Sequence, residues 1–482
     1  MSVVIGCDSF LALRNVRNGD LGRRLEGERV IVWVDPQQFQ GSYAARPAAV
    51  ELGCLEDFDV RQEPELRDLS NRAYLARKCY YDPGTAWVEL RQSSHRRNRH
   101  TYLRRAGSVG RAATTLASSW LAGRRGFAQR WRQQLATALR THPAARTYHL
   151  RLREVDASVV AGFSPEGTRE TALIEAANAL GIPTAVMIRS RDNLAAKIQH
   201  LPDAGAYLVW SKATRRFLIH MYPEVPVERV HVVGSPQFDH HLDTSHRLDR
   251  RAFFCLVGLD PARPLIVYSM ATPGLIEHEV AIAQHLADAA HRGAFVRGAQ
   301  VLVRGHPRMF GSSLRPLHQE YPEARSYPSP GRAPYGSPSH EAEVVRHILE
   351  DEPVHLATLA HQDVQVNVCG TMTIDSAILD KPTVNIYYDL VPGVPSGLSV
   401  RQVYARTDVR EMMAYGASRL ARSPEACIAL INRYLDDPGL DAAGRKRARE
   451  RDCGPLDGGA GRRVADVLQA LARHPVSALV PR

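Results

Sequence analysis

Three short polar stretches, each at the end of a predicted β-strand, carry residue types that bind phosphate groups. They are SMATPG at 269–274, RGHPRM at 304–309 and CGTMT at 369–373. Hydroxyl, guanidinium and imidazole groups donate hydrogen bonds to phosphate oxygens, and a guanidinium adds a positive charge. We expect the residues that bind a phosphate-containing ligand to be Ser269, Thr272, Arg304, His306, Gly370, Thr371, Thr373 and Asp375.

The segment 364–389, VQVNVCGTMTIDSAILDKPTVNIYYD, predicts a strand, a tight turn, a short helix and a second strand. This is one βαβ unit of a parallel sheet. Gly370 allows the backbone to approach a ligand closely, and the first-turn amides of the helix attract an anion. Asp375, one turn into the helix, is placed to accept hydrogen bonds from a ribose diol. The alternative is an ordinary structural helix with a threonine N-cap.

The central prediction is that the three stretches meet at one edge of a sheet. If the strands are parallel, the loops around Ser269, His306 and Thr371 leave from the same edge, where α/β sheets bind ligands. Arg304 then supplies charge to a diphosphate, and His306 supplies a directional donor. A histidine before a proline is otherwise commonly just part of a turn, so the functional interpretation depends on all three loops converging.

One carboxylate in the first half of the chain, Glu166, is a candidate general base, and Asp8 lies in a similar strand-end loop. Asp8 follows a predicted buried strand at residues 3–7, and Glu166 lies in the loop SPEGTRE after a predicted strand at 158–163. A base must reach the proton that it abstracts, and strand-end loops line the clefts of α/β proteins. The alternative for Glu166 is an exposed loop carboxylate without a catalytic role.

The positive charge of the chain is concentrated in one segment. The chain has a formal net charge of +11, and residues 91–153 contain fifteen arginines, no lysine and no acidic residue. Such a segment suits an anionic membrane, a nucleic acid or a phosphorylated acceptor. Of these partners we expect an anionic glycan or lipid-linked acceptor, or a membrane surface, and no nucleic acid.

The same segment also has helical periodicity. Apolar residues at spacings of four and seven form one helix face, with arginines between them, and Gly123 and Gly126 are expected to divide it into two helices. One interpretation is an acceptor-binding or membrane-facing helix pair; the other is an amphipathic pair packed on its own domain. The residues of the expected surface are Arg124, Arg125, Trp131 and Arg132.

Composition and absent motifs exclude several classes of protein. The apolar content of 44% is typical of a folded globular chain, and the seven cysteines form no CxxC pair. No P-loop, GxGxxG, GxSxG or HExxH motif is present. No basic region precedes an apolar run at the N-terminus, so we expect a cytoplasmic protein, peripheral on the inner face of the membrane if it contacts a membrane at all. We expect neither a metal nor a cofactor.

Alternating strands and helices predict an α/β protein with two domains. We expect a first domain at 1–240 that includes the basic helical insertion at 91–153, and a second at 241–450. A C-terminal helical segment at 451–482 is expected to cross back to the first domain. Residues 37–90 give no clear order of elements, and the Pro- and Ser-rich residues 320–340 are expected to form a surface loop.

Four motifs, in this order, resemble those of two-domain GT-B glycosyltransferases, especially bacterial surface-polysaccharide transferases. Their relatives include UDP-N-acetylglucosamine 2-epimerases and the glycerophosphotransferases of teichoic acid synthesis. The motifs are VWSKATRRFLI with VHVVGSPQFD (209–239), VLVRGHP (301–307), NVCGTMTIDSAILDKPTVNI (367–386) and LDGGAGRRVADVL (456–468). The resemblance covers roughly residues 155–472 and implies two Rossmann-like domains that face each other across a cleft.

The resemblance also implies that the second domain binds a sugar nucleotide. His306, Thr371 and Thr373 would face its phosphates, and Asp375 stands where the family commonly has a glutamate for the ribose. Such enzymes need no metal, because helix dipoles and basic side chains stabilise the leaving diphosphate. An inverting enzyme would take its base from Asp8 or Glu166; a retaining enzyme needs none.

Three functions remain open at this point. The first is a glycosyltransferase acting on a glycan or a lipid-linked or phosphorylated acceptor in surface polysaccharide synthesis. The second is a sugar-nucleotide 2-epimerase or a teichoic-acid-type glycerophosphotransferase. The third is a non-catalytic polyanion-binding protein that kept the fold. One architecture can host all of them.

Overall fold

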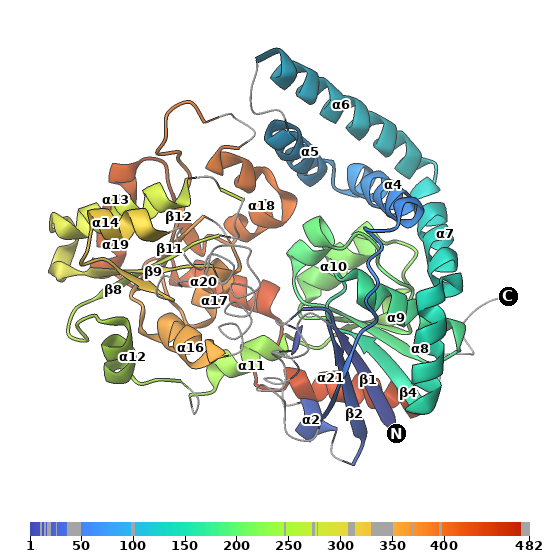
Figure 1. Cartoon of the computed structure of the whole chain (residues 1–482). Coiled ribbons are helices and arrows are strands. Elements are labelled where there is room, and N and C mark those ends of the chain that lie inside the picture. Colours follow the sequence, from blue (N-terminus) through green and yellow to red (C-terminus); the bar gives the residue numbers. More distant parts are fainter. Residues whose placement is uncertain are drawn as a thin grey trace. The chain divides into compact units, whose positions relative to one another are not determined.

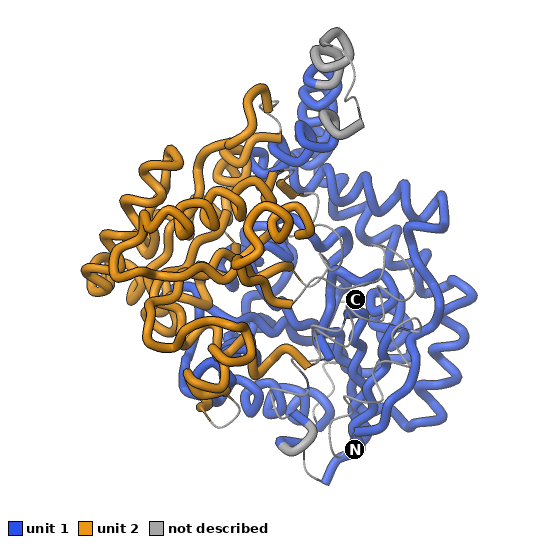
Figure 2. The backbone as a smooth tube through the Cα atoms, turned by 60° about the vertical axis from the view of Figure 1, so that its left-hand side comes forward, with its two compact units in different colours: residues 1–94, 98–242, 451–482 blue, residues 95–97, 243–450 orange. Residues whose placement is uncertain are grey.

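A computed structural model describes the chain in two compact units. It describes residues 1–9, 12–13, 16, 21–25, 27–35, 50–97, 102–244, 247–271, 275–276, 278–306, 314–328, 350–368, 370–394 and 398–473. Unit 1 contains residues 1–94, 98–242 and 451–482, and unit 2 contains residues 95–97 and 243–450 (Figure 2). Each unit is an α/β structure built on a parallel sheet (Figure 1).

The sheet of unit 1 has seven strands among the described residues, in the order β3-β2-β1-β4-β5-β6-β7. All of its neighbouring pairs are parallel. Strand β1 is buried along its whole length, as expected for a parallel sheet covered on both faces. The strands are β1 (Ser2–Cys7), β2 (Arg29–Val34), β3 (Val50–Cys54), β4 (Ala157–Gly162), β5 (Thr184–Ile188), β6 (Ala206–Val209) and β7 (Val230–Val232).

Helices pack around this sheet, and several of them share a buried apolar cluster with its strands. Helix α9 packs on β1, β4 and β5, and α21 packs on β4 and β6. The region 37–90, which could not be ordered from the sequence, supplies β3, α4 and most of α5. The helices are α2 (Leu21–Arg24), α4 (Pro64–Tyr81), α5 (Pro83–Arg97), α6 (Tyr102–Arg124), α7 (Phe127–Thr141), α8 (Pro143–Glu154), α9 (Thr168–Ala179), α10 (Lys212–Met221), α11 (Pro236–Leu242) and α21 (Ala460–Arg473), with a π-helix at Asn193–Lys197 and a 3-10 turn at Val227–Arg229.

The sheet of unit 2 has six strands among the described residues, in the order β10-β9-β8-β11-β12-β13. Its neighbouring pairs are also parallel. The strands are β8 (Leu265–Ser269), β9 (Gln300–Arg304), β10 (Arg325–Tyr327), β11 (Val364–Asn367), β12 (Thr383–Ile386) and β13 (Ser418–Ala421). Strand β10 lies in the region expected to be only a loop, and residues 329–340 of that region lie outside the described residues.

The helices of unit 2 cover its sheet in the same manner. Helix α13 packs on β9, α17 packs on β11 and β12, and α19 packs on β11, β12 and β13. The helices are α12 (Arg250–Val257), α13 (Glu279–His291), α14 (Arg315–Glu320), α16 (Glu352–His361), α17 (Thr371–Ile378), α18 (Thr407–Ala414), α19 (Pro424–Asp436) and α20 (Ala442–Ala448), with 3-10 turns at Val296–Gly298 and Val400–Ala405. A π-helix at Arg449–Cys453 contains the boundary between residues 450 and 451, where the chain returns to unit 1.

The strand order makes both units Rossmann-like. In each sheet the first strand of the unit lies between the second and the fourth, so the order reverses beside it. The reversal falls between β1 and β4 in unit 1 and between β8 and β11 in unit 2. Doubly wound sheets bind ligands at this switch point, outside the carboxyl ends of the strands. The expected fold of two Rossmann-like α/β domains is therefore confirmed.

The basic insertion is divided into helices α5 to α8. Gly126 sits between α6 and α7 in the left-handed region, with φ of 75°, so the predicted break is present there. Gly123 lies inside α6 and has a different role. A Cβ atom at Gly123 would come within 2.4 Å of the Ala76 carbonyl oxygen and 2.5 Å of Tyr80 Cβ, so this glycine allows α6 to pack tightly on α4.

The C-terminal segment belongs to unit 1. The carboxylate of Asp239 accepts hydrogen bonds from the backbone N–H groups of Ala460 and Gly461 at the start of α21. Arg463 donates to the carbonyl oxygen of Val233 at the end of β7, at 2.7 Å. Within the described residues, no helix combines the length and the apolar character needed to cross a membrane.

Candidate functional site

In unit 2, three strand ends line up at the switch point. Ser269 is paired in register with Arg304 of β9 on one side and with Asn367 of β11 on the other. The loops that begin after these residues therefore leave the sheet side by side. This is the arrangement predicted for the loops around Ser269, His306 and Thr371. Thr272 lies outside the described residues.

The loop after β8 is held by a buried glutamate. Glu279, the first residue of α13, accepts a hydrogen bond from the backbone N–H of Ala271 at 2.6 Å and one from the Tyr268 hydroxyl at 3.3 Å. Burial raises the pKa of Glu279 to about 7, although these two donors oppose the shift. The Ser269 hydroxyl is buried and has no hydrogen-bond partner among the described residues.

Arg304 is the last residue of β9 and is held in place on two sides. One terminal nitrogen donates to Asp351 at 2.7 Å, and the guanidinium lies 5.0 Å from the ring centre of Tyr327. Its second terminal nitrogen, Nη1, is buried without a hydrogen-bond partner among the described residues. Arg304 is therefore a fixed donor, with part of its charge already balanced by Asp351. His306 follows two residues later and is half-buried.

The turn between β11 and α17 exposes the start of the helix. Gly370 and Thr371 are exposed, and no atom lies within 4 Å of the position that a Cβ atom on Gly370 would take. The φ of Gly370 is −136°, which any residue adopts, so the absent side chain matters for space. The N-terminus of this eight-residue helix is therefore exposed at Gly370 and Thr371, while the Thr373 amide donates to the Gly370 carbonyl oxygen at 3.0 Å.

Thr373 differs from the expectation. Its side chain is buried, and its hydroxyl lies 3.3 Å from the amide nitrogen of Asn367 and 3.3 Å from the amide oxygen of Asn385. The hydroxyl thus ties α17 to the ends of β11 and β12. The prediction that it faces a phosphate is corrected, because its hydrogen bonds are made inside the unit.

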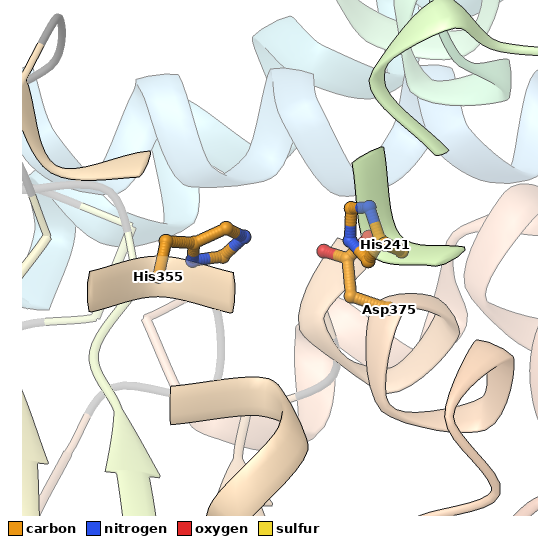
Figure 3. A group of neighbouring side chains, drawn as sticks. All are labelled: His241, His355 and Asp375. Carbon is orange, nitrogen blue, oxygen red and sulfur yellow. The ribbon is translucent and has the colours of Figure 1, made fainter. Parts of the chain in front are cut away.

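Asp375 lies on the second turn of α17, with His355 of α16 as a neighbour. Both belong to unit 2, and a ring nitrogen of His355 lies within 4.8 Å of a carboxylate oxygen of Asp375 (Figure 3). Asp375 is buried and His355 is half-buried. His355 was not singled out from the sequence. The first turn of a crossover helix lies at the carboxyl edge of a parallel sheet, and that position was the available signal.

The switch point of unit 1 is built from paired charges. Arg169 of α9 forms ion pairs with Asp8 at 3.4 Å, with Asp35 at 3.0 Å and with Asp57 at 3.1 Å. Its backbone N–H also donates to Asp8 Oδ2 at 3.2 Å. Burial raises the pKa of Asp8 to about 7; Arg169 lowers it and Asp35 raises it further. Asp8 is enclosed by these partners, with only 6% of its side chain exposed, so it has poor access to a substrate.

Glu170 occupies a space left by two glycines. Its oxygens accept the backbone N–H groups of Asp8 and Ser164, both at 2.6 Å. Gly6 and Gly162 face each other in register on β1 and β4, and a Cβ atom on either would come within 2.9 Å of the Glu170 side chain. Burial and the neighbouring Asp8 raise the pKa of Glu170 to about 8. This glutamate was missed in the sequence, although it stands four residues after Glu166.

Glu166 is the more accessible of the two candidate bases. One of its oxygens forms an ion pair with Arg189, which follows β5, and 23% of its side chain is exposed. Its other oxygen, Oε2, is buried without a hydrogen-bond partner among the described residues. Within unit 1, Glu166 and Asp8 both lie in loops at the carboxyl ends of neighbouring strands, β4 and β1.

The four expected surface residues divide into two groups. Arg124 and Arg125 are exposed, Arg124 lies 5.4 Å from the ring centre of Trp120, and the ring of Trp131 stacks on Phe127. Arg132 instead turns inward. It donates to the Leu201 carbonyl oxygen at 2.6 Å and pairs with Glu224 at 3.1 Å. The assignment of Arg132 to an exposed surface is therefore wrong.

Comparison with known proteins gives the fold and no closer relationship. No protein-family model matches the chain, and no curated protein matches its sequence. Among solved structures, S. aureus MnaA with UDP shares 10% identity at a TM-score of 0.53, covering 98% of this chain and 97% of that one. A putative UDP-N-acetylglucosamine 2-epimerase from Listeria monocytogenes shares 9% identity at a TM-score of 0.53, covering 97% of this chain and 96% of that one. UDP-GlcNAc 2-epimerase from Neisseria meningitidis, bound to UDP-GlcNAc, shares 9% identity at a TM-score of 0.50, covering 98% of this chain and 100% of that one.

These similarities agree with the two sheets described above. The likeness extends over almost the whole of each chain, so both Rossmann-like units are included. The chain therefore has a fold of the GT-B type, which these epimerase structures share.

Proposed function

We propose that this protein is a glycosyltransferase that moves a sugar from a nucleotide-sugar donor to an acceptor. The observation that carries the proposal is the alignment of Ser269, Arg304 and Asn367 at the switch point of unit 2, beside the exposed first turn of α17. This edge offers a hydroxyl, a fixed guanidinium and helix amides, which together suit a diphosphate. Structures of similar fold hold UDP or UDP-GlcNAc, which supports a uridine nucleotide as the first ligand to test.

In this proposal unit 2 binds the donor and stabilises the leaving group. Arg304, His306 and the amides at Thr371 take up the charge that develops on the diphosphate as the bond to the sugar C1 breaks. Asp375 holds the ribose. No metal or cofactor is assigned a role, since these side chains and the helix dipole supply the positive potential.

Unit 1 supplies the acceptor side. Glu166 takes the proton from the acceptor hydroxyl while the oxygen of that hydroxyl forms the new bond to C1, as in an inverting enzyme. Asp8 is the second candidate base, although Arg169 encloses it. Arg124 and Arg125, with Trp131 beside them, are proposed to contact an anionic glycan, a lipid-linked acceptor or the inner membrane surface.

A second function is a sugar-nucleotide 2-epimerase. Two features favour it: the structures of similar fold named above include UDP-N-acetylglucosamine 2-epimerases, and unit 1 has several carboxylates at its switch point. An epimerase moves the proton at C2 of the sugar. Deuterium from solvent entering C2 of UDP-GlcNAc would therefore favour the epimerase, and its absence alongside sugar transfer would favour the transferase.

The first experiment is a thermal-shift panel with UDP, CDP, GDP, dTDP and CMP. A ligand present at 100 times its Kd adds about 2.7 kcal/mol of stability to the folded state. We expect one nucleoside diphosphate to raise the melting temperature well above the others. If none of the five shifts the transition at millimolar concentration, the proposed donor site is contradicted.

A further inference from the structure

A small cavity in unit 1 lies between Glu166 and His200. About 10 Å³ of it is open to the centre of a water molecule, close to the least volume that holds one water. Its lining combines apolar side chains of α7, among them Leu135 and Leu139, with polar residues that include Glu166, Thr171, Gln199 and His200. The lining is largely apolar, and its few polar side chains can supply the two or more hydrogen-bond partners that one ordered water needs.

The hydrogen bonding of His200 fixes which ring nitrogen faces outward. Nε2 lies 3.5 Å from Glu175 Oε1, and the other Glu175 oxygen accepts from Arg140 at 2.9 Å. Burial lowers the pKa of His200, against the opposing effect of Glu175, so the ring is neutral at pH 7. A neutral ring that donates from Nε2 to a carboxylate has an acceptor lone pair at Nδ1. Nδ1 is buried without a hydrogen-bond partner among the described residues.

Glu166 presents a matching acceptor. Its Oε2 is likewise buried and without a hydrogen-bond partner among the described residues, while Oε1 pairs with Arg189. Leaving a buried acceptor unsatisfied is unfavourable, and both residues line the same cavity, so a donor shared by the two atoms would satisfy both. Water has two O–H groups and can donate to both acceptors at once. The side-chain amide of Gln199, which also lines the cavity, can donate to the water oxygen.

We propose that one buried water molecule links His200 Nδ1 to Glu166 Oε2, and that His200 is a positioning residue for Glu166. The link holds the Glu166 side chain from behind and favours its ionised form by donating to Oε2. The description of Glu166 as the base rests on the proposed function, whereas the water link does not.

The charged groups around His200 come from three helices. Glu175 of α9 faces Nε2, and Arg140 and Arg132 of α7 and Arg77 of α4 contribute positive charge nearby. Arg77 and Arg132 both pair with Glu224, at 2.6 and 3.1 Å. Burial is the main cause of the lowered pKa of His200, and Arg132 and Arg77 act in the same direction, which favours the neutral ring with an acceptor at Nδ1.

The first test is a crystal structure of the protein at a resolution that shows ordered water. We expect one water in the cavity within hydrogen-bond distance of both Nδ1 and Oε2. An empty cavity, or a direct contact between the two side chains, would overturn the link.

The second test compares His200→Leu with His200→Asn. Asparagine can place an acceptor near the position of Nδ1, whereas leucine removes it. The pKa of the Glu166 carboxyl, followed by ¹³C NMR of glutamate-labelled protein and assigned with Glu166→Gln, should rise by about one unit in His200→Leu, the equivalent of one hydrogen bond. It should stay close to the wild-type value in His200→Asn.

A matched control and an independent readout separate this proposal from the proposed function. His361→Leu removes a partly buried histidine of unit 2 that bonds the Leu248 carbonyl oxygen at 2.9 Å, and it should leave the titration of Glu166 unchanged. Equal Glu166 pKa values in wild type and His200→Leu would refute the link. The titration needs no turnover. If the protein binds no nucleotide sugar, the proposed function fails, and the titration still decides whether the water link exists.

Discussion

The two switch points share a scaffold and differ in their chemistry. Each unit places a buried glutamate in the first turn of the helix beside the switch point, and each glutamate accepts a backbone N–H from the loop after the first strand. In unit 1 Glu170 holds Asp8 and Ser164; in unit 2 Glu279 holds Ala271. The same device therefore shapes both edges, independently of what each binds.

The side chains that the two edges present are different. In unit 1, Asp8, Glu166 and Arg169 pair with opposite charges, so the edge contains ionisable groups suited to proton transfer. In unit 2 the edge presents the Ser269 hydroxyl and the amides of α17, and Arg304 is its positive charge. Under the proposed function, one fold repeated in the chain supports an acid–base edge in unit 1 and an anion-binding edge in unit 2.

Removing the shared glutamate is expected to have the largest effect. Glu170→Ala leaves two buried N–H groups without an acceptor, at a cost of about 1–3 kcal/mol each. The free energy of unfolding of unit 1 should therefore fall by about 3 kcal/mol or more. Glu279→Ala leaves one N–H group and one hydroxyl without an acceptor. It should lower the free energy of unfolding of unit 2 by somewhat less.

Tryptophan fluorescence during urea unfolding measures the first of these effects. All five tryptophans lie in unit 1: Trp33, Trp87, Trp120, Trp131 and Trp210. Hydrogen exchange of peptides from residues 265–304 reports on unit 2. Equal fluorescence midpoints for wild type and Glu170→Ala would show that the glutamate does not hold the edge.

The pH dependence of stability should differ between the units. The folded-state pKa values of Glu170 and Asp8 are raised to about 8 and about 7, from ordinary values of 4.5 and 3.8. Between the ordinary and raised values the folded state binds more protons, so stability is full below about pH 4 and falls as the pH rises to about 8. Two carboxyl pKa values are raised in unit 1, so the loss of stability should be larger there than in unit 2. In unit 2 burial raises the pKa of Glu279 to about 7, and the lowered pKa values of His285, His318 and His361 act in the opposite sense.

Urea midpoints from pH 5 to pH 8 measure this slope. The midpoint reported by tryptophan should fall with pH in the wild type, and the fall should be shallower in Glu170→Gln and in Asp8→Asn. A wild-type midpoint that rises over this range would contradict the burial of these carboxyls in protonated form.

Nucleotide binding should separate the two edges. Asp375→Ala removes the proposed ribose acceptor and should weaken the preferred nucleoside diphosphate about tenfold, or about 1.4 kcal/mol. Asp8→Ala is the matched control on the other edge and should leave this affinity unchanged. Isothermal titration measures both. A larger loss in Asp8→Ala than in Asp375→Ala would reverse the assignment of the two edges.

The smallest effect is expected from the exposed arginines. Arg124→Ala should change stability by no more than about 0.5 kcal/mol, because the side chain is exposed. It should still weaken binding to vesicles that contain anionic lipid. Arg132→Ala should destabilise unit 1 instead, since it breaks the ion pair with Glu224 and the bond to Leu201. Sedimentation with vesicles and urea unfolding distinguish the two; equal destabilisation would contradict the inward position of Arg132.

Much of the fold could be predicted because parallel strands are continuous apolar runs that end in polar loops. The segments around Cys7, Ser269 and Asn367 have this form, so the pattern alone predicted their strands. It also predicted that Ser269 and Asn367 lie at one edge of the unit 2 sheet. The elements of region 37–90 could not be predicted, because β3 is only partly buried and has a weak pattern, and because α4 has charged residues along most of its length.

The side-chain partners could not be predicted in the same way. Thr373 and Arg132 have residue types suited to binding an anion, but their partners, Asn385 and Glu224, come from distant parts of the chain. The space for Glu170 depends on two glycines in register on different strands, and register is set by the tertiary structure. Sequence shows which residues reach an edge, and packing decides which of them face a ligand.

Hydrogen exchange with and without the preferred nucleoside diphosphate tests the central claim most directly. We predict that the nucleotide slows exchange in three segments of unit 2, residues 265–271, 300–306 and 370–378, which surround Ser269, Arg304 and Thr371. Protection confined to unit 1, or absent from all three segments at saturating nucleotide, would contradict the assignment of the donor site to this edge.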